Sequence, residues 1–369
     1  MSTSLSTSGR TNVPAPDPAP DPMQALAPAL RQHARQQWRG LWAMGAVLLL
    51  LSVALLLLSN SYWLKTFTSA LTLSVAVAGT ALLYGQLGLV SLCQYALVAV
   101  GGWVALRLSH GFGLPFELCV LAGGLCASAA GMVAGLPALR LKGLYLALVT
   151  LMMAGGYQVL VSAVGFPDGG SGWLGKAQGT GRLMMARPAW AESNAAYLAY
   201  VVAWLALILV LIEWHRRSRA GRSWALIRRG EAAATSAGVH VLLYQSWAFG
   251  LAGFCAGVAG ALLAGGVGQL DGRAFAASES VLMFALTVVG GAYHWLGTLL
   301  AGLLLRAVPA LLTEWGVNGF LAQVFFGAAL LHALITAPRG IAGQWVDGLT
   351  RLFAHLFARP PGPSRERRS

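Results

Sequence analysis

The sequence predicts an all-α, polytopic membrane protein with about ten transmembrane helices, and three observations lead to this fold class. Hydrophobic residues make up 57% of the 369 residues and charged residues only 10%, whereas a soluble domain carries about 25% charged residues. The mean hydropathy is +0.66. Most apolar runs also approach the roughly 20 residues that a membrane-spanning helix needs. A soluble fold of this composition would expose far too much apolar surface, so the chain requires a lipid bilayer as its solvent.

The chain divides into three parts. Residues 1–37 form a polar tail in which proline recurs at alternate positions from Pro14 to Pro22. This composition is typical of a disordered segment and is too polar for a signal peptide. Residues 38–343 form the membrane domain, and residues 344–369 form a basic tail. The membrane domain contains ten apolar runs, at 41–58, 66–84, 89–107, 115–138, 144–164, 196–214, 246–268, 279–292, 295–314 and 319–337.

The run at 279–292 is short and ends in two glycines. A partial or tilted span at this point would change the number of spans by one or two. Glycine is abundant, with 46 residues, and often lies inside the apolar runs. Because small residues allow helix backbones to approach closely, this pattern favours a compact many-helix bundle.

The basic residues predict the orientation of the bundle. With ten spans and a cytoplasmic N-terminus, the cytoplasmic side holds 18 of the 25 Lys and Arg residues. They are four in the N-terminal tail, two near Arg140, six between Arg216 and Arg229, and six from Arg339 onward. The positive-inside tendency therefore predicts that both termini of this inner-membrane protein lie in the cytoplasm. Basic residues scattered between apolar runs also argue against a nucleic-acid partner, which requires them on one face.

The predicted cytoplasmic connection, residues 215–245, is the most informative segment. Residues 225–239 within it are rich in alanine, which favours a helix, and Gly238 is suited to end that helix. One interpretation is a solvated basic loop that only determines topology. The other is a short helix that docks into another protein, with a small, flat alanine face and arginines that meet acids on the partner.

The sequence contains no recognisable catalytic or metal-binding pattern. The seven histidines have no paired spacing, and no pair of acids falls inside an apolar run. All four cysteines lie in apolar runs and are expected to act as small buried side chains. Gly170–Lys176 has the spacing of a phosphate-binding loop, but Ala177 replaces the hydroxyl residue that would bind magnesium. These observations disfavour an intramembrane enzyme, a metal site and a nucleotide site.

Several polar residues within the apolar runs are candidates for a polar pathway through the membrane. Two of them lie three positions apart and therefore share one face of a helix. Hydrogen bonds between helices explain such residues equally well, and an anchor at the membrane interface also suits the tyrosine among them. The candidates are Ser91, Gln94, Tyr145, Thr150 and Gln158.

Arg306 is the only charged residue well inside an apolar run. A charge at this depth is costly and usually faces the protein interior or water. Pro309 follows it, so we expect the helix to break nearby and the side chain to snorkel to the outer interface. An ion-coupled carrier would need titratable groups at the membrane midplane, and Arg306 is the one residue that qualifies.

The sequence resembles the permeases of ABC importers for branched-chain amino acids. The segment 225–239 is similar to their Glu-Ala-Ala coupling loop, with Gly238 seven residues after Glu231. Five further segments resemble motifs of this family and follow in the same order. The resemblance covers residues 66–343, and these segments are Gly88–Gln94, Arg140–Leu151, Gly169–Leu174, Val288–Gly297 and Ala337–Gly343.

The resemblance implies a type II ABC importer permease-like bundle that forms the pathway for branched-chain or other aliphatic amino acids. The implied partners are a second, homologous permease, two cytoplasmic ATPase subunits that use ATP and magnesium, and a periplasmic substrate-binding protein. The chain itself would bind no cofactor and would not be an enzyme. Urea and short amides are alternative substrates, and an ion-coupled carrier is an alternative mechanism. The residues implied to couple to the ATPase are Arg228, Arg229, Glu231, Ala232, Ala233 and Gly238.

Overall fold

The chain forms two compact units, residues 1–47 and residues 48–369, and the helical bundle belongs to the second. The predicted disordered tail, most of the last apolar run and most of the basic tail lie outside the described residues. The computed structural model describes residues 43–57, 60–141, 143–170, 172–176 and 183–318, with scattered residues from 321 to 345.

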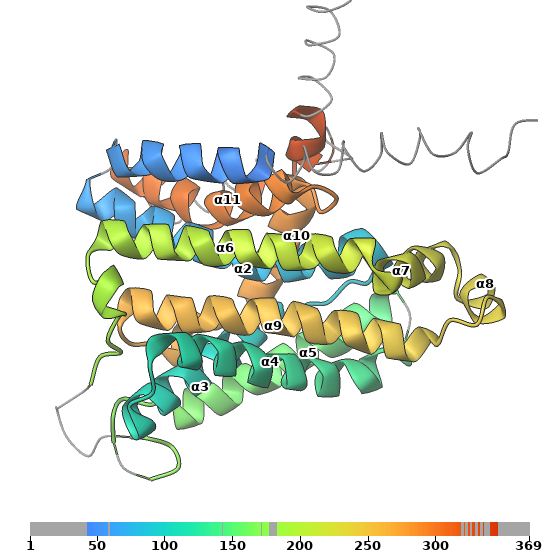
Figure 1. Cartoon of the computed structure of the whole chain (residues 1–369), viewed down its shortest axis with the longest axis horizontal. Helices are drawn as coiled ribbons and strands as arrows, with labels where there is room; N and C mark the ends of the chain where they lie inside the picture. The colour runs from blue at the N-terminus through green and yellow to red at the C-terminus, as the bar shows by residue number, and fades with distance from the viewer. Residues whose placement is uncertain are drawn as a thin grey trace, which may run out of the picture. The chain divides into compact units, whose positions relative to one another are not determined.

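The predicted all-helical membrane fold is confirmed (Figure 1). Six helices of the described residues are long and apolar enough to cross a membrane: α2 with its π-helical extension η1, α4, α5, α6, α9 and α11. The longer elements are Ala43–Leu57, α2 Ser61–Leu82, η1 Leu83–Leu87, α3 Gln94–Phe112, α4 Phe116–Ala138, α5 Leu144–Val164, α6 Asn194–Arg217, α7 Arg219–Arg229, α8 Glu231–Ser236, α9 Val241–Val267, α10 Ala277–Gly290 and α11 Trp295–Glu314, with short 3-10 turns at η2 Ala189–Ala191 and η3 Gly272–Ala274.

Three predicted runs can be compared directly with these helices. The run 144–164 coincides with α5, and α10 is short, with 14 residues, as its sequence indicated. The predicted run 89–107 differs, because α3 begins only at Gln94. Gly88 adopts a left-handed conformation with φ +72°, which ends η1 and leaves residues 89–93 irregular. Glycine adopts this conformation without steric cost, so the helix stops there.

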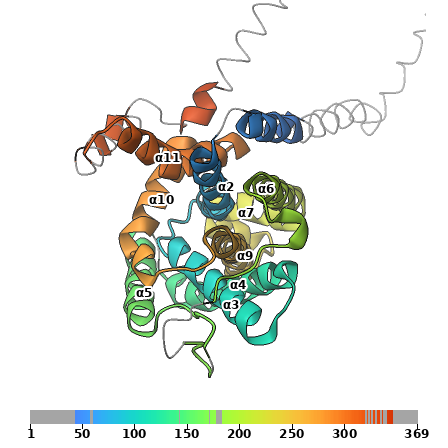
Figure 2. The same cartoon turned by 90° about the vertical axis from the view of Figure 1, so that its left-hand side faces the viewer.

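Helix α9 forms the centre of the bundle. It packs directly against α2, α3 and α4, and the end-on view shows these helices around it (Figure 2). The most apolar stretch of α9 is 94% buried, compared with 28% in α5 and 33% in α11. The described residues therefore leave most of the apolar surface of α5 and α11 uncovered.

Glycines explain how closely the central helices approach one another. A methyl group on Gly257 of α9 would collide with the Gly123 carbonyl of α4, and one on Gly101 of α3 would collide with Gly257. A methyl group on Gly260 would likewise collide with the Val98 carbonyl. Only glycine fits at these contacts, which confirms the small-residue packing that the sequence predicted.

His294 begins α11 and is the N-cap of that helix. Its Nδ1 atom accepts a hydrogen bond of 3.2 Å from the Leu296 N–H, which requires a neutral ring. Burial lowers the pKa of His294 below its usual value of 6.5; nearby Arg216 lowers this pKa further, and Glu213 opposes the shift. The folded state therefore favours neutral His294.

This cap predicts a pH-dependent contribution to stability. Because the folded state holds the His294 pKa below 6.5, the contribution is full above pH 6.5 and is lost as the pH falls below that value. His294→Asn retains an N-cap acceptor but does not titrate. We expect the variant to lose less thermal stability than the wild type between pH 7.5 and pH 5, measured on purified protein in detergent. Equal losses in the two proteins over this pH range would contradict this assignment.

Candidate functional site

Helices α7 and α8 form the connection that the sequence singled out. The Ser218 hydroxyl accepts a 3.1 Å hydrogen bond from the Ala220 N–H and caps the start of α7. Gly238, with φ +77°, follows the end of α8, so the predicted helix stop is confirmed. A break at Gly230 separates the two helices, which the alanine-rich pattern did not indicate.

Helix α7 is firmly attached to the bundle. Trp224 is fully buried, and its Nε1–H donates a 2.9 Å hydrogen bond to the Tyr244 carbonyl at the start of α9. Ile227 of α7 and Ala234 of α8 are also buried. A buried aromatic side chain with a satisfied hydrogen bond anchors its helix, so Trp224 joins α7 to the start of α9.

Arg228 connects α7 to two further elements of the same chain. Its guanidinium donates to the Gly85 carbonyl in η1, and it donates a 3.0 Å hydrogen bond to the Tyr293 hydroxyl between α10 and α11. The guanidinium also lies over the Tyr293 ring, 5.1 Å from its centroid. The sequence suggested that Arg228 meets acids on a partner, whereas the structure shows it bonded to the bundle.

The other predicted coupling residues lie on the surface of this end of the bundle. Arg229, Ala232, Ala233 and Gly238 are exposed, and Figure 1 shows α8 projecting beyond the helices. Glu231 is within 3.5 Å of the Gln245 side-chain amide on α9. The exposed face of α8 therefore consists of small residues, and the buried side of the helix packs on the bundle.

The five pathway candidates have different surroundings. Ser91, Gln94 and Thr150 are buried, Gln158 is half-buried, and Tyr145 is exposed at the start of α5. The Ser91 hydroxyl lies 3.4 Å from the Cys93 sulfur. None of the five borders the two cavities described below.

The hydrogen bonds of these candidates join helices. Thr150 of α5 accepts a 2.9 Å bond from the Leu92 N–H, and Gln94 of α3 donates a 2.7 Å bond to the Ala252 carbonyl of α9. Gln158 accepts a 2.9 Å bond from the Ala277 N–H at the start of α10. These contacts correspond to the interhelical alternative that the sequence left open.

A cavity of about 540 Å³ lies at the opposite end of α9 from α7 and α8. Arg306 of α11 borders it and donates a 3.2 Å hydrogen bond to the Tyr95 hydroxyl of α3. The expected helix break near Pro309 is wrong, because α11 continues through Pro309 to Glu314. Arg306 is exposed, and its partner Tyr95 was not among the sequence candidates. A second cavity of about 350 Å³ shares Gln269, Leu270 and Asp271 with the first.

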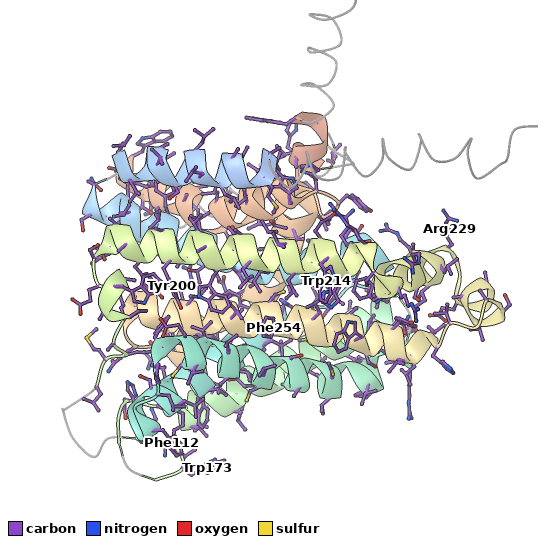
Figure 3. All side chains as sticks on the ribbon, in the orientation of Figure 1. Phe112, Trp173, Tyr200, Trp214, Arg229 and Phe254 are labelled. Carbon is purple, nitrogen blue, oxygen red and sulfur yellow. The ribbon has the colours of Figure 1, made fainter. Side chains whose placement is uncertain are left out.

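The two ends of the bundle therefore differ in character. Figure 3 shows Arg229 at the α7–α8 end, and Phe112 and Trp173 at the opposite end. Within the described residues, no group of three or more His, Cys, Asp and Glu side chains is arranged to hold a metal ion. The first end presents exposed small residues of α8 and the second a cavity.

A multi-pass helical bundle with these two ends defines a membrane permease subunit. The chain belongs to the family of branched-chain amino acid transport system permease components, whose profile matches residues 62–334. Its role is therefore that of a transport component rather than of an enzyme.

Two relatives are permease proteins named LivM of high-affinity branched-chain amino acid transport systems. The chain is 29% identical to that of Escherichia coli K12 over 296 residues, which cover 74% of this chain and 68% of the relative. It is 28% identical to that of Salmonella typhimurium LT2 over 288 residues, which cover 71% of this chain and 66% of the relative. The chain thus spans about two thirds of these relatives. No solved structure matches significantly.

The contacts of Arg228 predict that it links α7 to the bundle. Arg228→Ala removes its bonds to Gly85 and Tyr293, and we expect a stability loss of about 1 kcal/mol or less because the side chain is exposed. We also expect the variant to take up clearly less substrate for each ATP hydrolysed, although its stability changes little. Both quantities are measured on the assembled transporter, by thermal melting and in proteoliposomes.

Arg222→Ala is the matched control, since Arg222 lies on the same helix and the only described hydrogen bond of its side chain is a 3.5 Å contact with the Arg217 carbonyl. Equal uptake per ATP in the two variants would show that the Arg228 contacts carry no mechanical role.

Proposed function

We propose that this chain is the membrane-spanning permease subunit of an ABC importer that forms the pathway for branched-chain or other aliphatic amino acids. It lies in a bacterial inner membrane with both termini in the cytoplasm. The observation that carries the proposal is the exposed small-residue face of α8, supported by buried Trp224 and Ala234. Membership of the permease family supports the class of cargo.

The proposed assembly has three other kinds of component. A second, homologous permease completes the pathway, and two cytoplasmic ATPase subunits bind ATP and magnesium and dock on α7 and α8. A periplasmic binding protein delivers the substrate to the opposite end. The names of both relatives, permease proteins of a high-affinity transport system, support a multi-component system.

The exposed sides of the bundle suit this arrangement. Helices α5 and α11 are less than half buried along their most apolar stretches, so they require lipid or a second permease as cover. Urea or short amides as substrates, and an ion-coupled carrier, are the competing functions. An ion-coupled carrier would take up substrate without the ATPase subunits, which separates it from the proposed importer.

The proposed orientation predicts which surface positions are accessible from outside. Trp173 and Ser236 are exposed at opposite ends of the bundle. We expect Trp173→Cys, in a chain without its four native cysteines, to react with an impermeant maleimide in intact spheroplasts. Ser236→Cys should react only after the membrane is opened. Labelling of Ser236→Cys in intact spheroplasts would reverse the orientation.

The proposed docking surface predicts variants that uncouple the transporter without unfolding it. Ala233 is exposed on α8, so Ala233→Glu leaves the bundle intact but places a charge in the ATPase interface. A buried unpaired charge costs several kcal/mol, so ATPase binding should weaken on the order of a hundredfold. Co-purification of the ATPase and ATP-driven uptake in vesicles measure the effect.

Gly238 provides a second variant and its matched control. No atom lies within 4 Å of the position that a Cβ atom would take on Gly238. Gly238→Trp therefore meets the partner rather than the bundle, although its positive φ adds strain of about 1–2 kcal/mol. Gly238→Asn tolerates this φ better and adds less bulk. Normal ATPase binding and normal uptake by both Ala233→Glu and Gly238→Trp would contradict the docking role and leave this segment with an effect on membrane topology alone.

A further inference from the structure

The cavity of about 540 Å³ is lined by both polar and apolar side chains. Arg306 of α11 and Tyr95 of α3, which are joined by a hydrogen bond, form its polar wall. Leu263 and Val267 of α9 form its apolar wall, and the Phe275 ring lies 5.4 Å from the Tyr95 ring. A ligand that fills such a cavity favourably has a polar group at one end and a hydrocarbon body at the other.

Arg306 retains unused hydrogen-bond donors in this position. A guanidinium has five N–H donors in a planar fork, and the single described bond of Arg306 is the one to Tyr95. No described Asp or Glu lies within ion-pair distance of Arg306. The positive charge therefore faces the cavity without a carboxylate partner from the described part of this chain.

Tyr95 adds a second donor beside the first. Its ring is almost fully buried, and its hydroxyl oxygen accepts the bond from Arg306. The hydroxyl proton has no acceptor among the described residues. Two adjacent donors and one positive charge make the polar wall suited to a carboxylate, which a guanidinium recognises with bidentate geometry.

We propose that Arg306 and Tyr95 bind the carboxylate of an aliphatic amino acid whose side chain packs on the apolar wall of this cavity. The assignment rests on the proposed function, and it deepens that function by naming the group that the permease recognises. Asp271 borders the same cavity and complements the ammonium group of such a ligand. Urea carries neither charge and has no hydrocarbon body, so this cavity selects against it.

The test measures equilibrium binding of radiolabelled leucine to the assembled transporter in lipid nanodiscs, without the binding protein. Leucinol, which lacks the carboxylate, is the competing probe. We expect the wild type to bind leucine at least tenfold more tightly than leucinol, because leucinol cannot form the charged hydrogen bonds that the carboxylate accepts. Arg306→Gln should weaken leucine binding roughly tenfold or more and remove the preference over leucinol.

Three further variants make the result specific. Arg306→Lys retains the charge but not the fork, so it should retain part of the preference. Tyr95→Phe should weaken leucine binding a few-fold by removing one donor. Lys65→Gln is the matched control. Lys65 is exposed at the end of α2 that lies near the cavity, but it does not border the cavity. It should bind leucine like the wild type.

The outcomes separate this assignment from the proposed function. If the wild type imports leucine with ATP and the binding protein, while Arg306→Gln binds and imports leucine normally, the assignment is overturned and the proposed function stands. Equal affinity of the wild type for leucine and leucinol, or no leucine binding at all, overturns it too. If Arg306→Gln does not assemble, unchanged binding by Tyr95→Phe overturns it. A wild type that imports no aliphatic amino acid contradicts the proposed function itself.

Discussion

The pairing of backbone N–H and carbonyl groups inside the membrane is the constraint on which the rest of the structure depends. Lipid offers these groups no hydrogen bonds, so each break in a helix must be satisfied by protein. The irregular segment before α3 is the clearest case. The Thr150 and Ser280 hydroxyls accept bonds from the Leu92 and Tyr95 N–H groups. At the end of α9, Arg187 donates to the carbonyls of Gly265 and Gly266.

Polar side chains inside this bundle therefore follow from its helix breaks. The breaks place irregular backbone in the interior, and α5 and α10 contribute the hydroxyl groups that satisfy it. Tyr95, which lies in the first turn of α3, directly follows this irregular segment. The break before α3 thus has two consequences. It ends the span formed by α2 and η1, and it positions the Tyr95 hydroxyl that contacts Arg306.

Much of the fold could be predicted from the sequence, because apolar run length is a local property. The run 144–164 became α5, and Gly238 ended α8 as expected. The late start of α3 was missed, since Gly88 lies within an apolar stretch whose composition continues past it. Among the candidate sites, Arg306 was recognised as unusual, but its partner Tyr95 lies 211 positions away. Contacts between residues so far apart in the sequence depend on helix packing, which no local sequence pattern predicts. The inward contacts of Arg228 escaped notice for the same reason.

The glycine contacts of α9 restrict how a permease of this design adapts to new cargo. Gly253, Gly257 and Gly260 meet neighbouring backbone so closely that no larger side chain fits. Larger side chains are thereby excluded at these three positions of α9. The cavity is bordered by other residues, from α2, α3, α9, α11 and the segment 269–275, so a change in the transported compound does not require these glycines to change. Exchanging those borders between homologous permeases is the most direct route to an importer with altered selectivity.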